Sequence, residues 1–246
     1  LVAPGVPVAT VENLDNYGLL TDITPEQKRD RVLERYKKMY SPMIGSGPVM
    51  EFLGQTGLDA MKGADILNVA PSMYSSTVEY ADTSIAKKLK GIAQIHLANL
   101  GTRIFYCDLG SFDTHADQLS THTKLWSSAS LAIRDFFDDL EEHNAADNVT
   151  MFLFSEFGRR VYDNGAGTDH GAGGACLVIG KNVKGGEYGQ YPSMREGDLD
   201  QGDLVPDMDF RSVYTTLAED WMKLDPIPIV GGQFEKPGFM VSSTKN

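Results

Sequence analysis

The stretch Val149-Thr150-Met151-Phe152-Leu153-Phe154 is short and nearly all apolar, which is typical of a strand that is buried on both faces of a parallel sheet. The residues before it, 121–142, repeat apolar side chains every 3.6 residues and predict a long amphipathic helix. Further upstream, residues 102–107 are rich in β-forming residues and predict another strand. A strand, a helix and a strand in this order predict a right-handed crossover and therefore an α/β fold.

The rest of the chain predicts further helices and one more strand. Helical spacing of apolar residues favours helices at about 25–39, 49–61 and 84–99, while residues 175–179 form another apolar run of strand length. Asp209 is a suitable capping residue for a last helix that continues to Met222. We expect one domain over residues 1–246, in which 1–100 is mainly helical and 101–246 contains the strands.

The composition excludes some classes of function. The chain has 22 Lys and Arg against 34 Asp and Glu, a net charge of −12, and such a surface repels nucleic acid and anionic membranes. Its longest apolar runs are too short to cross a bilayer. Both cysteines, Cys107 and Cys176, lie inside apolar runs and are expected to be buried thiols rather than a disulfide or a nucleophile. We expect neither a nucleic-acid partner nor a membrane span.

Three acid-bearing segments, each placed after an apolar run, carry the candidate chemistry. Ligand crevices of open α/β sheets lie beyond the carboxyl ends of the strands, and carboxylate and imidazole groups there suit a divalent metal. The pattern favours a metal-centred hydrolase site. The segments are Ser111-Phe112-Asp113-Thr114-His115, Ser155-Glu156-Phe157-Gly158-Arg159-Arg160 and Gly167-Thr168-Asp169-His170-Gly171.

Each of these segments also has a structural interpretation. An Asp beside a His in a loop is often a turn or capping arrangement, and glycines around His170 are ordinary turn residues. Glu156 would emerge at a strand end, where it can bind a metal, act as a base or pair with Arg159 or Arg160. The planar fork of Arg159 suits a phosphate or sulfate oxyanion, and it suits a structural salt bridge equally well.

Several ordered motifs resemble the bacterial exported family called domain of unknown function 1501, which belongs with the alkaline phosphatase and sulfatase superfamily. The resemblance covers roughly residues 80–235. It rests on Phe112-Asp113-Thr114-His115-Ala116-Asp117-Gln118, Phe154-Ser155-Glu156-Phe157-Gly158-Arg159-Arg160, Asn164-Gly165 with Gly167-Thr168-Asp169-His170-Gly171, Val183-Lys184-Gly185-Gly186, and Asp209-Phe210-Arg211-Ser212-Val213-Tyr214.

The resemblance implies an exported, metal-dependent hydrolase of small phosphate or sulfate esters, on a mixed and mostly parallel sheet flanked by helices. It implies one or two divalent ions, which would be Zn, Ca, Mg or Mn. By the same resemblance, Asp113, His115 and His170 would hold one ion and Glu156 would belong to a second. Asp169 would be a ligand or would orient His170. Independently of the resemblance, its planar fork makes Arg159 our candidate catalytic residue.

The chain departs from the family pattern in two places. The family has a Gly-Gly-x-Asp-Gly segment on its first strand, where superfamily members carry a metal-binding Asp and usually the nucleophile, and no such segment occurs here. We therefore expect the carboxyl part of a longer protein, whose amino-terminal strand comes from a missing fragment or subunit. Glu156 also stands where the phosphatase pattern has Asp-His. The alternative is a non-catalytic surface or binding protein that retains the fold and one metal.

Overall fold

The computed structural model describes residues 9–11, 14, 26–67 and 69–241. The chain divides into two compact units. The first unit comprises Leu1–Leu109 and Ser128–His143, and the second unit comprises Gly110–Ser127 and Asn144–Asn246. The first boundary lies between Leu109 and Gly110. The single domain over 1–246 stays a prediction.

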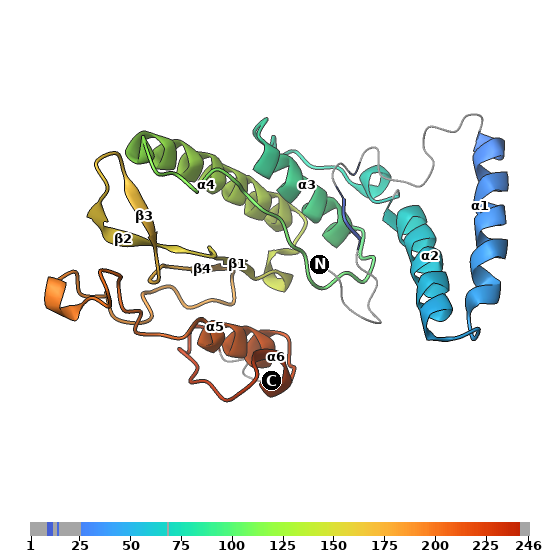
Figure 1. Ribbon diagram of the computed structural model, residues 1–246. Coiled ribbons are helices and arrows are strands. Elements are labelled where there is room, and N and C mark those ends of the chain that lie inside the picture. The colour runs from blue at the N-terminus through green and yellow to red at the C-terminus, as the bar shows by residue number, and fades with distance from the viewer. Residues whose placement is uncertain (1–8, 12–13, 15–25, 68, 242–246) are drawn as a thin grey trace. The chain divides into compact units, whose positions relative to one another are not determined.

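Helices dominate the described part of the first unit. They are α1 (Glu26–Tyr40), α2 (Pro48–Leu67) and α3 (Ser84–Leu97), and Figure 1 shows α1 and α2 side by side. Thr83 caps α3, because its side chain accepts a hydrogen bond from the backbone N–H of Ala86. None of the described helices is long and apolar enough to cross a membrane.

Helix α4 (Gln118–Glu142) contributes residues to both units and confirms the long helix predicted at 121–142. Its apolar stripe is buried in the first unit, where Phe136 and Leu140 are almost fully enclosed. The carboxylates Asp135 and Asp139 are buried on the same helix. The stripe is therefore partly polar, and its carboxylates need partners from elsewhere in the unit.

The strands of the second unit pair in two antiparallel sets. β1 (Met151–Leu153) pairs with β4 (Leu177–Ile179), and β2 (Gly158–Asp163) pairs with β3 (Thr168–Gly171). The chain is thus mixed α/β, but the prediction of a mostly parallel sheet is wrong for the described strands. A tight turn joins β2 to β3, and such a connection brings strands together antiparallel, whereas parallel neighbours need a long crossover.

Two apolar runs are less buried than we predicted. Residues 102–107 form no strand, and the side chains of Ile104 and Tyr106 are 75% and 63% exposed. The crossover that we predicted from this strand is therefore also wrong. Cys176 is exposed and both cysteines are free thiols. A β-forming composition produces a strand only where a partner strand supplies hydrogen bonds, and residues 102–107 have none of the described strand pairings.

The core of the second unit lies between the β1–β4 pair and the last helices. Helix α5 (Phe210–Thr216) continues as a π-helical turn at Leu217–Trp221, and α6 (Ile227–Val230) follows. Val213 of α5 is buried with the late residues Phe239 and Met240. The backbone of residues 182–184 hydrogen-bonds residues 239–241, which holds this late segment in place.

Asp209 caps α5, as predicted, and provides a test of pH dependence. Its carboxylate accepts hydrogen bonds from the side chain and backbone N–H of Arg211, and these bonds lower the pKa of Asp209 from 3.8 to about 2. Because the folded protein binds a proton at Asp209 less strongly than the unfolded chain does, the ionised carboxylate stabilises the fold above pH 3.8. That contribution is lost as the pH falls through about 2.

The variant Asp209→Asn retains a capping side chain but removes the charge. We expect wild type to exceed this variant in free energy of unfolding near pH 6, and the difference to shrink on acidification through the same interval. Urea denaturation of both proteins from pH 6 to pH 2 measures it. A difference that stays constant over this range would contradict the assignment.

Candidate metal site

Three of the predicted ligands converge within the second unit. One ligand atom from each of Asp113, His115 and His170 lies within 4.8 Å of the others. Asp113 Oδ1 is 2.7 Å from His170 Nε2 and 3.1 Å from His115 Nε2. All three side chains are exposed, at 66%, 51% and 41% respectively. We call these three residues the Asp–His–His triad; it is a candidate metal site that solvent can reach.

The triad comes from two segments that are distant in sequence. Asp113 and His115 lie in the segment immediately before α4, whereas His170 lies on β3 opposite Arg159 of β2. Our structural interpretation of the glycines around His170 was an ordinary turn, but the structure places His170 in a hairpin strand. The pairing with β2 fixes its backbone, which a loop position would not do.

Hydrogen bonds extend the triad on one side. Asp169 Oδ1 lies 3.3 Å from His115 Nδ1 and accepts a bond from Asn164 Nδ2 at 3.0 Å. Asp169 therefore contacts His115, whereas we expected it to be a ligand or to orient His170. The bonds from Asn164 and His115 lower the pKa of Asp169, and the bond from His170 leads those that lower the pKa of Asp113. Both carboxylates are held in the ionised form that binds cations.

Arg159 holds the segments around the triad together. Its Nη1 donates to the carbonyl of Thr168 at 2.7 Å, and its Nη2 donates to the carbonyl of Phe112 at 2.6 Å. Both partners are backbone carbonyls: Phe112 directly precedes Asp113, and Thr168 lies on the strand that carries His170. The structure therefore shows a contact for this guanidinium that neither of our sequence interpretations included.

Phe157 is a site residue that the sequence reasoning missed. Its ring stacks on the imidazole of His170, with ring centres 3.8 Å apart and planes inclined by 6°. Asn164 was also missed as a partner of Asp169. Both residues stand inside the quoted motifs, but an aromatic or amide side chain in a motif does not reveal which group it contacts.

Glu156 lies outside the triad. Its side chain is exposed, and among the described residues no hydrogen bond or ion pair joins it to the triad, to Arg159 or to Arg160. Arg160 instead pairs with Asp203 at 3.1 Å. A second ion at Glu156 stays a prediction.

Gly167 allows the β2–β3 turn to approach the loop that carries His115. A Cβ atom at this position would lie 3.0 Å from the carbonyl oxygen of His115 and 3.4 Å from Cβ of Gln118. Thr168 also donates a hydrogen bond to the side chain of Gln118 at 2.9 Å. These contacts set the turn directly against the start of α4, so the hairpin and the His115 loop are positioned together.

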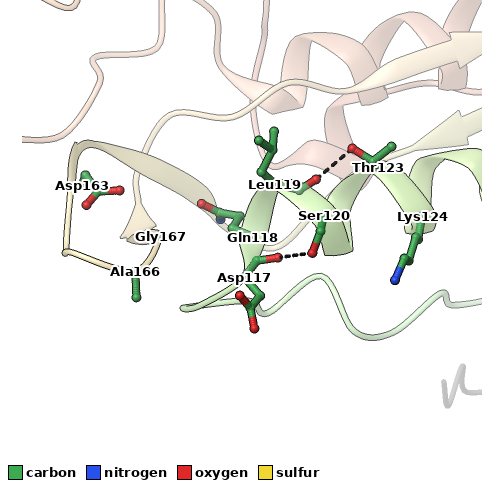
Figure 2. A pocket seen from close by; sticks show the side chains of 9 residues that line it. All are labelled: Asp117, Gln118, Leu119, Ser120, Thr123, Lys124, Asp163, Ala166 and Gly167. Carbon is green, nitrogen blue, oxygen red and sulfur yellow. Dashed lines mark hydrogen bonds between the residues drawn. The ribbon is translucent and has the colours of Figure 1, made fainter.

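A hollow of about 690 Å³ lies where the turn meets the start of α4. Figure 2 shows Asp163, at the end of β2, with Ala166 and Gly167 of the turn on one side and the first turns of the helix on the other. Charged groups in its lining are the ammonium of Lys124 and the carboxylates of Asp117 and Asp163. The helical lining residues are Asp117, Gln118, Leu119, Ser120, Thr123 and Lys124.

The comparisons with known proteins identify a family but no characterised relative. A family model described as "Protein of unknown function (DUF1501)" matches residues 51–225. No curated protein and no solved structure matches the chain. The match contains the Asp–His–His triad, Phe157 and Arg159.

Proposed function

This chain belongs to the DUF1501 family of proteins of unknown function, and we propose that it is a metal-dependent hydrolase of phosphate or sulfate esters. The proposal rests on one observation: ligand atoms of the Asp113 carboxylate and of the His115 and His170 imidazoles all lie within 4.8 Å of one another. A divalent ion on these groups would activate water and polarise an ester oxygen.

The donor set fits such an ion. Two imidazole nitrogens and a carboxylate oxygen are the three protein ligands of one common kind of catalytic zinc site, which keeps a further position open for water or substrate. Ligand atoms around a tetrahedral zinc are separated by roughly 3.3 Å, and the contacts of 2.7 and 3.1 Å to Asp113 Oδ1 are close to this spacing. The exposure of the triad supports access by a small ester.

The surrounding residues support ligation through Nε2 of His115. When Nε2 binds a cation, Nδ1 carries the proton and donates it to a neighbouring acceptor. Asp169 provides this acceptor, and Asn164 holds the carboxylate of Asp169 in place. Partners of this kind orient a ligating imidazole and increase its basicity. We therefore assign Asp169 to orienting His115.

We propose Zn²⁺, Mn²⁺, Ca²⁺ or Mg²⁺ as the ion and an exported location for the protein, the location resting on the family resemblance. A second ion at Glu156 is an expectation of that resemblance, and an oxyanion contact from Arg159 is an expectation from its planar fork. The attacking group would be a water molecule activated by the ion.

The separate position of Glu156 favours a second candidate function. With one three-ligand site and no described second site, the chain is also suited to a non-catalytic surface or binding protein that retains a single metal. Both candidates bind a metal ion, but only the hydrolase converts an ester substrate.

Metal binding depends on the triad in both candidates. We expect wild type to bind a divalent ion stoichiometrically, and Asp113→Ala and His170→Ala each to reduce the affinity by more than ~100-fold, because each removes one of three ligands. Titration calorimetry and elemental analysis measure both quantities. Asp82→Ala is the matched control, since Asp82 is an exposed carboxylate paired with Lys87 in the first unit. Unchanged binding in both triad variants would refute the site.

Hydrolysis then separates the two candidates. We expect the metal-loaded protein to hydrolyse aryl phosphate or aryl sulfate esters, and both triad variants to lose this activity while Asp82→Ala retains it. The assay is run with each of the four ions. Bound metal without turnover of either ester class would favour the binding protein.

A further inference from the structure

We propose that Arg159 and Phe157 are positioning residues that hold the two segments of the Asp–His–His triad in a ligating arrangement. This inference rests on the proposed metal site and extends it to residues that touch no ion. We call the two residues the Arg159–Phe157 pair. They precede His170 in sequence, and both contact residues of the triad segments.

Arg159 connects the backbones that carry the ligands. Its Nη2 donates to the carbonyl of Phe112, the residue immediately before Asp113, and lies 3.4 Å from the hydroxyl of Thr114, the residue immediately after it. Its Nη1 donates to the carbonyl of Thr168 on β3, the strand that carries His170. One planar guanidinium thus fixes the spacing between the Asp113 loop and β3.

Only arginine suits this arrangement. A guanidinium directs donors in a rigid fork, so that it reaches two separate carbonyls at once, whereas a lysine ammonium is a single point on a flexible stem. A lysine at position 159 would retain the positive charge but would lose the simultaneous contacts to Phe112 and Thr168. The substitution Arg159→Lys therefore tests the geometry of the side chain while its positive charge is retained.

Phe157 restrains the imidazole of His170. The two rings are nearly parallel at 3.8 Å, and His170 also stacks on His115 at 4.9 Å with an inclination of 29°. The guanidinium carbon of Arg159 lies 5.0 Å from the centre of the Phe157 ring. Tilting of the imidazole would break the ring contact, so Phe157 restrains the plane in which Nε2 of His170 reaches Asp113.

These contacts assign Arg159 to a task other than oxyanion binding. Both terminal nitrogens are engaged with main-chain carbonyls, and the side chain is half-buried. A binding site gains affinity when its ligands are held near the productive geometry before the ion arrives. The pair therefore acts through the ligands, by reducing the reorganisation that metal binding requires.

The test is a titration of the whole chain with Co²⁺, whose visible absorption reports ligand geometry. We expect Arg159→Ala and Arg159→Lys each to weaken Co²⁺ binding by about 10–100-fold, the range for groups that orient ligands, and to alter the absorption spectrum. The failure of lysine to rescue distinguishes positioning from a need for charge. Arg160→Lys is the matched control and should bind as wild type, since Arg160 contacts Asp203 and Gln201 instead.

Phe157 is tested by a second pair of variants that leave the hydrogen bonds of Arg159 intact. Phe157→Tyr keeps an aromatic ring and should retain binding, whereas Phe157→Leu should weaken it. If the Arg159 variants fail to fold in thermal denaturation, this pair still decides the inference. Wild-type affinity and spectrum in both Arg159→Lys and Phe157→Leu would overturn it.

A measurement without metal separates this inference from the proposed function. The imidazole ¹⁵N resonances of His115 and His170 report their hydrogen bonds to Asp113, and we expect Arg159→Lys to shift them while Arg160→Lys does not. If wild type binds no Co²⁺, the proposed function fails, and these shifts still decide the positioning role. Unchanged imidazole resonances in Arg159→Lys and Phe157→Leu would then refute that role.

Discussion

Gly158→Ala is expected to displace the β2–β3 hairpin and to abolish metal binding without changing any ligand. A Cβ atom at this position would lie 1.7 Å from the carbonyl oxygen of Gly173 and 2.3 Å from its carbonyl carbon. Both atoms belong to the backbone, so no side-chain rotation relieves the collision. The backbone of β2 must move instead, and Arg159 and the paired His170 move with it.

We expect this substitution to lower the free energy of unfolding by about 3 kcal/mol or more, at the upper end of the range for overpacking. Urea denaturation and a Co²⁺ titration measure the two effects. Gly197→Ala is the matched control, because a Cβ atom there meets nothing within 4 Å and should leave stability and binding unchanged. A Gly158→Ala protein with wild-type stability would show that this close approach is absent in solution.

Asp139→Ala is expected to cause the largest loss of stability in the first unit. The Asp139 side chain is fully buried, and its Oδ2 accepts hydrogen bonds from the hydroxyls of Tyr74 at 2.8 Å and Tyr80 at 2.7 Å. Burial, followed by the bond to Asp139, raises the pKa of both tyrosines, so the hydroxyls remain donors. Alanine would leave two hydroxyls without their acceptor beside a new cavity.

The neighbouring histidine adds to this cost. Asp139 Oδ1 lies 3.3 Å from Nδ1 of His143, although the shorter contact of that nitrogen, at 2.8 Å, is to the Asp139 carbonyl. We assign the hydrogen bond to the carbonyl because of its length, and treat the carboxylate as an electrostatic partner. The pKa of His143 is raised, first by its bond to the Asp139 carbonyl, then by its bond to the Ser75 carbonyl and by the nearby charges of Asp139 and Glu142.

We expect Asp139→Ala to lower the free energy of unfolding by about 3–5 kcal/mol, the range for removing one partner of a buried charged network. Asp138→Ala is the adjacent control; Asp138 is exposed and lies 3.9 Å from Arg134, so its loss should change stability by less than about 1 kcal/mol. Guanidinium denaturation compares the two variants. Equal stability of both would show that the tyrosine contacts contribute little.

Helices were predictable from the sequence because their signal is local. The apolar residues of α4 recur with the helical period and lie on the buried stripe, and Asp209 caps α5 within the same few residues. The strands were less predictable. An apolar run such as 149–154 fits parallel and antiparallel pairing alike, and the partner of β1 is β4, some twenty-five residues later.

The ligand types of the candidate site were readable from short motifs, since Asp113 and His115 are neighbours and His170 stands beside a second carboxylate. Their contacts were not. Asp169 meets His115 and Arg159 meets Phe112 across about fifty residues of chain, and such pairs form only when the hairpin packs against the start of α4.

The sequence by itself therefore determined the helices, the acidic character and the identity of the three candidate ligands, because periodicity, charge and neighbouring residues are properties of short segments. Only the tertiary structure decided that the strands pair antiparallel, that residues 102–107 remain without a described strand partner, and that Glu156 stays apart from the triad. These outcomes depend on which distant backbone groups and side chains meet, and local composition does not specify that choice.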